Sequence, residues 1–157
     1  MKPTVYLGAD HAGFAMKESI KDHLVNQDYI VEDLGAPKFD ENDDYPQYAA
    51  AVAKAVKAHP GSLGVLSCGN AEGIAIAANK FVDIRAGVGY SIDSAKTMRT
   101  DDDANIIAIP GRLKIEDDAL EIVEAFLSTL YSGEERHKRR IAEIAGIHPD
   151  DRKGPTL

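Results

Sequence analysis

Cysteine, tryptophan and long apolar runs are scarce or absent in this sequence, and each scarcity excludes something. The chain of 157 residues has one cysteine and no tryptophan, so neither an internal disulfide nor a CxxC metal pair can form. No apolar run approaches the roughly 20 residues that a membrane-spanning helix needs. The start "MKPTVYLGAD" leads straight into strand-like sequence without the pattern of a signal peptide. These features predict a cytoplasmic protein without a membrane partner.

Positive charge is also in short supply. The formal net charge is −8, and a nucleic-acid backbone requires a basic face, so nucleic acid is not expected as a partner. The exception is the run "RHKRR" at 136–140. Such a run is either a solvated helix face or a local site for a small anion such as a phosphate. Arg136, His137 and Arg140 fall within about one helical turn and so share a face, which keeps the anion site open as an alternative.

The sequence does contain a regular alternation of short apolar runs with segments of helical periodicity. Strands are expected at 4–8, 30–33, 63–67, 86–90 and 106–109, and helices at 14–25, 48–58, 73–80, 91–100, 117–130 and 134–145. Strands separated by helices of about ten residues form βαβ units with a parallel sheet. The prediction is an α/β protein, a three-layer αβα sandwich around a five-stranded parallel sheet. It would be Rossmann-like or flavodoxin-like, with an extra C-terminal helix.

A single domain is expected over residues 1–148, because the length fits one core and no linker or repeat interrupts the pattern. The polar end "HPDDRKGPTL" contains two prolines, and residues 149–157 are expected to be a loosely held tail. In the first helix the periodicity predicts Phe14, Ile20, Leu24 and Val25 as core residues.

The loop "CGNAEG" at 68–73 is the first candidate for function, because ligands of open α/β sheets bind at the carboxyl ends of the strands. Gly69 and Gly73 allow the backbone to approach a ligand closely. The helix that follows presents free N–H groups to an anion, and the same environment stabilises a thiolate at Cys68. The alternative is that Cys68 is a buried residue at a strand end. The loop lacks the GxxxxGK[ST] pattern of nucleoside triphosphatases.

Other candidates follow the remaining strands. Asp10 and His11 end the first strand and could bind hydroxyl groups or a phosphate, whereas Asp10 could instead cap the first helix. Tyr45 lies in "DYP" at 44–46, a weak signal by itself. Arg112 comes directly after the last strand, where it could face an anion.

Together these pieces resemble the type B ribose-5-phosphate isomerase family, which also contains the galactose-6-phosphate isomerase subunits. The matching stretches are "GADHAGFAMK" (8–17), "DYPQYA" (44–49), "SCGNAEGIAIAANK" (67–80), "IRAGVGYSIDSAKTMR" (84–99), "DDANIIAIPGR" (102–112) and "YSGEERHKRRIAEI" (131–144). They occur in the family's order over nearly the whole chain.

The resemblance implies an aldose–ketose isomerase of a sugar phosphate that needs no metal and no organic cofactor. A base removes the proton on C2 of the aldose, a cis-enediolate forms, and a proton returns at C1. Cys68 matches the residue that is the base in most members. The loop from Gly69 to Gly73, including Asn70, Ala71 and Glu72, matches the segment whose N–H groups hold the enediolate oxygen.

The resemblance also implies homodimers, or pairs of dimers, whose active sites are shared between two chains. Asp10 and His11 match a substrate-contacting motif, and Tyr45 matches the tyrosine of the "DYP" segment. The phosphate-binding set is matched by Arg112 and, from the neighbouring chain, by Arg136, His137 and Arg140.

Two segments depart from the family pattern. Where most members have the histidine that opens the furanose ring, followed by asparagine, this chain has Asp101 and Asp102 in "RTDDDAN". Asp101 is therefore expected as the ring-opening acid if it is protonated. In the loop, "CGNA" replaces "CGTG" or "CGSG". These changes suggest, as alternatives, a four-carbon or six-carbon sugar phosphate as substrate, or a non-catalytic sugar-phosphate-binding subunit.

Overall fold

The computed structural model describes residues 2–147 and contains one parallel sheet of five strands. The strands are β1 (Val5–Ala9), β2 (Val31–Asp33), β3 (Leu63–Cys68), β4 (Ala86–Val88) and β5 (Ile106–Pro110). Their order in the sheet is β2-β1-β3-β5-β4, and every neighbouring pair is parallel. The predicted α/β class is confirmed. The order differs from the flavodoxin order only in the exchange of the last two strands.

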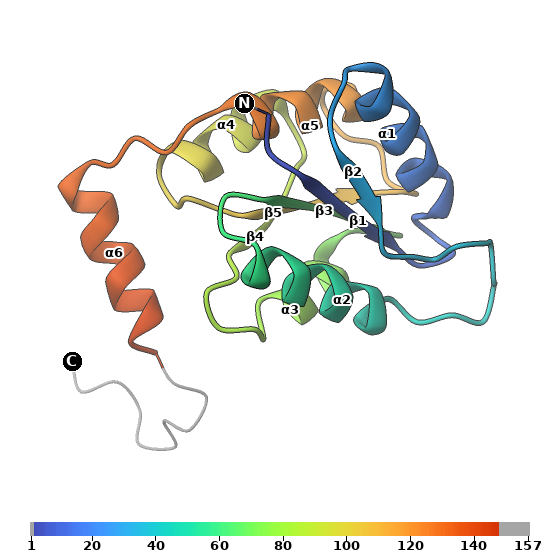
Figure 1. Cartoon of the computed structure of the whole chain (residues 1–157), viewed down its shortest axis with the longest axis horizontal. Coiled ribbons are helices and arrows are strands. Elements are labelled where there is room, and N and C mark those ends of the chain that lie inside the picture. The colour runs from blue at the N-terminus through green and yellow to red at the C-terminus, as the bar shows by residue number, and fades with distance from the viewer. Residues whose placement is uncertain (1, 148–157) are drawn as a thin grey trace.

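Helices cover both faces of this sheet (Figure 1). On one face lie α1 (Phe14–Asn26), α4 (Ile92–Thr100) and α5 (Ala119–Ser128), and on the other lie α2 (Tyr45–Ala58) and α3 (Glu72–Ala78). Each face buries its own hydrophobic cluster, so the sandwich has two core layers. The last helix, α6 (Glu135–Ala145), extends away from the sandwich at one end, in the place of the expected extra C-terminal helix.

Most expected elements form, and the differences lie at their ends. Ser91 caps α4, and its hydroxyl accepts a hydrogen bond from the backbone N–H of Ser94. The start of α2 is Tyr45 instead of residue 48, because Pro46 is accommodated in the first helical turn. The prediction that Val25 is a core residue is wrong, since Val25 is 55% exposed. Ile20 and Leu24 face the sheet, and the next residue is rotated about 100° away from them.

Two placements concern the ends of the chain. The tail expected at 149–157 lies outside the described residues. Between residues 2 and 147, no helix combines the length and the apolar character that crossing a membrane requires.

A buried lysine fixes the loop after β2 to α1. The side chain of Lys17 is 1% exposed, and its Nζ contacts both carboxylate oxygens of Asp33 at 2.7 Å and the carbonyl oxygen of Ala36 at 2.8 Å. Burial opposes the ionisation of Asp33, but the hydrogen bonds from Lys17 and Lys21 outweigh it and lower the pKa of this carboxyl group. The ammonium group thus holds the start of the loop that leads to α2.

We expect Lys17→Met to lower the free energy of unfolding by about 2–4 kcal/mol, because it leaves Asp33 without its buried partner. Lys21→Met is the matched control, since Lys21 contacts the same carboxylate at 2.8 Å but is more exposed, and a loss of about 0–1 kcal/mol is expected. Urea unfolding at pH 7 measures both. The ion pair's contribution is present above the ordinary aspartate pKa of about 4 and is lost as the pH falls from there through the lowered pKa of Asp33 in the folded protein. Equal losses from both variants would contradict this account.

Candidate active site

The carboxyl ends of β1 and β3 form the topological switch point of the sheet. These strands are neighbours, with Ala9 opposite Ser67, and the chain goes from β1 outward to β2 before it returns to β3. In such sheets the crevice at this point is where ligands bind. The register therefore places Asp10 and Cys68, the next residues along the two strands, at the same edge and beside each other.

Cys68 is the last residue of β3 and is 3% exposed. Its Sγ lies 3.9 Å from Oδ1 of Asn70, which is an exposed residue of the loop that follows. Ala71 is buried and has a φ of +71°, in the left-handed region that favours glycine. Glu72 begins α3 with its side chain exposed to solvent. The loop thus turns sharply over the thiol.

Two further expected residues lie against this loop. The ring of Tyr45 packs so closely on Gly73 that a Cβ atom at residue 73 would lie 2.8 Å from Cζ of the tyrosine. Arg112 donates its backbone N–H to the carbonyl oxygen of Gly69 at 3.0 Å, and its side chain is exposed above the edge of the sheet. Gly73 is therefore required by the aromatic ring, and the loops after β3 and β5 are joined.

Asp10 and His11 have different partners. Asp10 is 5% exposed, and its Oδ1 accepts the backbone N–H groups of Ala12 and Gly13 at 3.0 Å, so it holds the turn before α1. His11 instead contacts Asp43, which comes from the loop before α2. Its backbone N–H donates to Oδ1 of Asp43 at 2.8 Å, and its Nδ1 lies 2.9 Å from the same oxygen.

The partners of His11 favour its charged form. Tyr48 donates its hydroxyl to Oδ2 of Asp43 at 2.9 Å. The hydrogen bond that the imidazole donates to the carboxylate of Asp43 raises the pKa of His11 above its ordinary value. Burial opposes the ionisation of Asp43, but the hydrogen bonds from His11 and Tyr48 lower its pKa. Burial, together with the neighbouring carboxylate, raises the pKa of Tyr48 to about 12. The imidazole is thus held in place by Asp43 in the loop after β1.

The remaining expected residues lie at the opposite edge. Asp101 follows the end of α4. Asn105 lies just before β5, and its carbonyl oxygen accepts the backbone N–H of Gly64 near the start of β3, which places this loop at the amino edge of the sheet. The six residues of β3 span roughly 17 Å. Within one chain, Asp101 and Asp102 are therefore separated from Cys68 by the length of the sheet.

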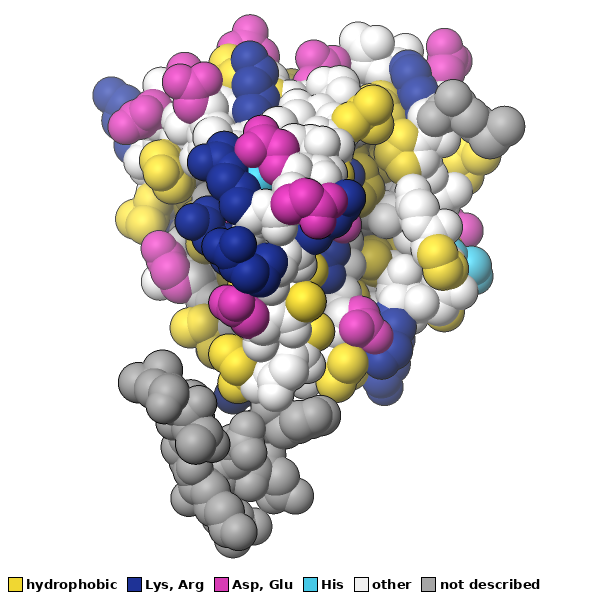
Figure 2. Space-filling view, turned by 90° about the vertical axis from the view of Figure 1, so that its left-hand side faces the viewer, with side chains coloured by type: hydrophobic (Ala, Val, Ile, Leu, Met, Phe, Trp, Pro, Cys, Tyr) yellow, Lys and Arg dark blue, Asp and Glu magenta, His cyan; other side chains and the backbone are white. Residues whose placement is uncertain are grey.

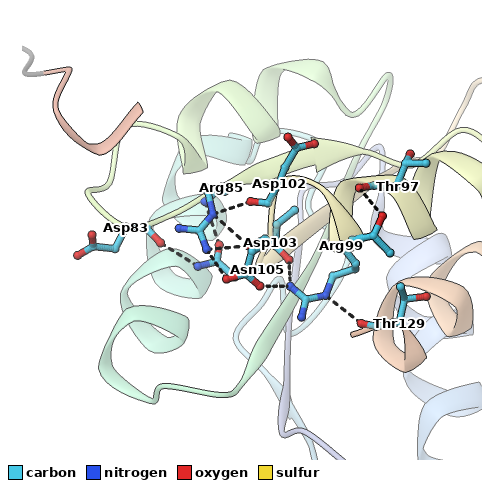
Figure 3. A network of polar contacts seen from close by, with 10 residues as sticks. Asp83, Arg85, Thr97, Arg99, Asp102, Asp103, Asn105 and Thr129 are labelled. Carbon is cyan, nitrogen blue, oxygen red and sulfur yellow. Dashed lines mark hydrogen bonds and ion pairs between the residues drawn. The ribbon is translucent and has the colours of Figure 1, made fainter. Parts of the chain in front are cut away.

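The loop that carries these aspartates is held by two arginines (Figure 3). Asp103 has a φ of +45°, and its carboxylate accepts from Nη2 of Arg85 at 2.9 Å and from Nη1 of Arg99 at 2.8 Å. Arg85 also donates to the carbonyl oxygen of Asp102, whose carboxylate points away from the network. A doubly bound carboxylate fixes the backbone of the loop, and so it fixes where Asp101 lies.

The basic run of α6 lies near this second group of residues. Figure 2 shows lysine and arginine side chains gathered on this helix. Arg136 and Arg140 are exposed, whereas His137 is 3% exposed and its Nε2 lies 3.7 Å from Oδ1 of Asp101. The three residues therefore do not present one common surface. Among residues 2–147, no group of three or more histidine, cysteine or acidic side chains is arranged to hold a metal ion.

The sequence did not predict the side chains that position the candidate site residues. Asp43 and Tyr48 orient His11, and Arg85 and Arg99 grip Asp103. Asp43 is part of the acidic run directly before "DYP", but its partner is 32 residues away, and nothing local in the sequence indicates that pairing.

Comparisons with known proteins show the family of the chain. The model of the family described as Ribose/Galactose Isomerase matches residues 5–144. Ribose-5-phosphate isomerase B of Mycobacterium tuberculosis strain H37Rv is 42% identical over 141 residues, which cover 90% of this chain and 87% of that one. The enzyme of the same name from Escherichia coli K12 is 41% identical over 143 residues, with 91% and 95% covered.

Solved structures are similar over the same length. Ribose-5-phosphate isomerase B from Mycoplasma genitalium, with bound ribulose-5-phosphate, has a TM-score of 0.86 and 36% identity, covering 93% of this chain and 96% of that one. The enzyme from Thermotoga maritima has a TM-score of 0.87 and 38% identity, covering 92% and 99%. Fold and sequence similarity together define an α/β enzyme with a parallel five-stranded sheet. The chain belongs to the Ribose/Galactose Isomerase family.

The pairing of His11 with Asp43 leads to a testable prediction of the pKa of His11. We expect His11 to titrate above its ordinary value of about 6.5 in the wild type and to move back towards it in Asp43→Asn, because the amide offers no charge to the imidazolium. Tyr48→Phe is the control, since it removes only the outer hydrogen bond and should shift the titration less. Two-dimensional NMR of the imidazole signals measures the three pKa values. An unchanged titration in Asp43→Asn would refute the role of the carboxylate.

Proposed function

We propose that the protein is an aldose–ketose isomerase that interconverts ribose 5-phosphate and ribulose 5-phosphate. The single observation that carries this proposal is the position of Cys68 at the carboxyl edge of the sheet, at the switch point of this family's fold, where the loops that carry His11 and Arg112 also begin. The relative from Mycoplasma genitalium, which shares 36% of the residues, was solved with ribulose-5-phosphate bound. Residues 1–148 would form the single isomerase domain.

Cys68 acts in this proposal as the base. Its thiolate removes the proton on C2 of the open-chain aldose, and the electrons of the C–H bond form the cis-enediolate. The hydroxyl proton on O2 passes to O1, and the resulting thiol then returns a proton to C1, which yields the ketose with its carbonyl group at C2. N–H groups of the loop from Gly69 to Gly73 stabilise the enediolate oxygen, and this electrostatic effect is the larger share of catalysis. The base itself contributes roughly 10²–10⁴-fold.

The substrate phosphate supplies the reason for a homodimer. Arg112 lies at the carboxyl edge with Cys68, whereas Arg136 and Arg140 lie on α6, which extends away from the sandwich. We propose that α6 of one copy brings these arginines, together with Asp101 and Asp102, to the carboxyl edge of a second copy. Each site is then incomplete without the partner, as expected for a symmetric dimer whose interface includes the active site.

A second candidate is an isomerase of a four-carbon sugar phosphate. It is favoured by the aspartate at position 101, because a four-carbon aldose with its terminal oxygen esterified cannot close a furanose ring and needs no acid to open one. A six-carbon sugar phosphate and a non-catalytic binding subunit remain alternatives. The presence of Cys68 disfavours a non-catalytic binding subunit, because such a protein does not need the thiol. The thiol has to stay reduced to act as a base, and the cytoplasm is a compartment that keeps thiols reduced, so we propose a cytoplasmic location.

The first test is turnover of ribose 5-phosphate by the wild type and by Cys68→Ser, with four-carbon and six-carbon aldose phosphates as a substrate panel. We expect the highest kcat/KM for ribose 5-phosphate and a loss of roughly 10²–10⁴-fold in the variant, which keeps the shape of the residue but not the base. Ser67→Ala is the matched control. It removes the buried hydrogen bond to the carbonyl oxygen of Ile109, about 1 kcal/mol of stability, and should keep kcat. A higher kcat/KM for another sugar phosphate would identify that sugar as the substrate. Full activity of the Cys68→Ser variant would refute the role of Cys68 as the base.

Subunit mixing tests the shared site. Cys68→Ala and Arg140→Ala should each be inactive or nearly so, because each homodimer lacks one half of both sites. After subunit exchange, half of the dimers are mixed, and each mixed dimer has one intact site, so about a quarter of wild-type activity should appear. Native mass spectrometry checks that mixed dimers have formed. Mixed dimers without a gain in activity would show that both halves come from the same chain.

A further inference from the structure

His137 is buried in an unusual way. Its side chain is 3% exposed, and its Nε2 has no hydrogen-bond partner among the residues that the structure describes. Buried polar atoms are almost always paired, so an unpaired one calls for an explanation. The nearest charged group is the carboxylate of Asp101, with 3.7 Å between Nε2 and Oδ1. This arrangement differs from what a phosphate ligand needs, because the ring faces a carboxylate of its own chain.

Asp101 is the exposed member of this pair. Its side chain is 46% exposed, and its Oδ1 also accepts the hydroxyl hydrogen of Thr100 at 2.7 Å. The clamp of Arg85 and Arg99 on Asp103 fixes the same loop from the other side. The backbone N–H of Ser132 donates to the carbonyl oxygen of Thr100, which ties the segment before α6 to the end of α4. The carboxylate is thus held in one place with one side free for a substrate.

We propose that Asp101 and His137 together hold the proton that opens the furanose ring of the sugar phosphate bound to a second copy of the chain. This inference rests on the proposed function. Asp101 would be the catalytic residue, because it touches the sugar, and His137 would be a positioning residue that acts through it.

The charges of the two groups explain why they act as a unit. A lone carboxylate next to an anionic substrate is a poor source of protons, whereas an imidazole and a carboxylate in contact are neutral as a pair when they hold one proton. Arg136 and Arg140 remain on the exposed surface of α6 for the phosphate. The chain therefore keeps an imidazole at this edge of the site, although the residue at position 101 is an aspartate.

The ring-opening step balances without any other reagent. The pair gives its proton to the ring oxygen as the bond between C1 and that oxygen breaks. The electrons of the O–H bond on C1 form the carbonyl group, and the proton released from that hydroxyl returns to the pair. The products are the open-chain aldehyde and a pair in its starting state, ready for Cys68 of the other copy to remove the proton on C2.

Exchange between the α and β anomers of ribose 5-phosphate tests this step without isomerisation. In a Cys68→Ala background the dimer should still open and close the ring, and NMR magnetisation transfer at C1 should show exchange that rises with protein concentration. Adding Asp101→Asn should reduce the protein-dependent rate at least about 100-fold. Adding Asp101→His, which supplies the imidazole that most family members have, should restore it. Adding His137→Gln should lower the rate at saturating sugar but leave the half-saturating concentration unchanged.

The outcomes separate this inference from the proposed function. The Asp101→Asn variant is expected to fold, because the side chain of Asp101 is about half exposed. Size-exclusion chromatography and thermal unfolding check that every variant is folded and dimeric. Persistent exchange in Asp101→Asn, no exchange in the Cys68→Ala parent, or a His137→Gln effect confined to the half-saturating concentration would each overturn the inference. The last result would make His137 a phosphate ligand. Loss of the proposed function would appear separately, as a wild type that does not isomerise ribose 5-phosphate.

Discussion

The structure depends on one constraint, the parallel direction of all five strands. Parallel strands send every loop that follows a strand to one edge of the sheet and every loop that precedes a strand to the other. Cys68 ends β3, and His11 and Arg112 follow β1 and β5, so all three belong to the carboxyl edge. The aspartates at 101 and 102 precede β5 and lie at the amino edge. The proposed division of the candidate site between two copies of the chain is a consequence of this direction.

Much of the fold is predictable from the sequence, because βαβ units are recorded in the alternation of short apolar runs and helical periods. The switch point follows from the same pattern, since it requires only that β1 and β3 be neighbours. The pattern does not contain the exchange of β4 and β5, which depends on packing across the sheet. It also assigned Val25 to the core because an apolar residue at the end of a helix fits the period nearly as well as Leu24 does.

Only part of the candidate site is predictable from the sequence. Residues that follow strands were found because strand ends carry ligands in this class of fold. The supporting groups were not, since Asp43 meets His11 and Asp103 meets Arg85 only after the chain has folded. His137 shows the limit most clearly. Its place in a basic run indicated a shared face with two arginines, whereas in the structure its ring is buried and turned towards Asp101. Helical spacing gives the direction of a side chain only approximately, and the last helix packs too little against the sandwich for burial to be inferred from its period.

The separation of the two edges also bears on how such an enzyme can diverge. Residues at the carboxyl edge surround the thiol, and their neighbours constrain them closely, as the contact between Tyr45 and Gly73 illustrates. In the loop at 101–105 the arginines bind the side chain of Asp103 and only the backbone of Asp102, so the side chains at 101 and 102 can change without disturbing the clamp. Evolution can thus alter the amino-edge contribution while the surroundings of Cys68 stay intact in the same polypeptide. A duplicated gene could specialise at one edge and still assemble with its parent.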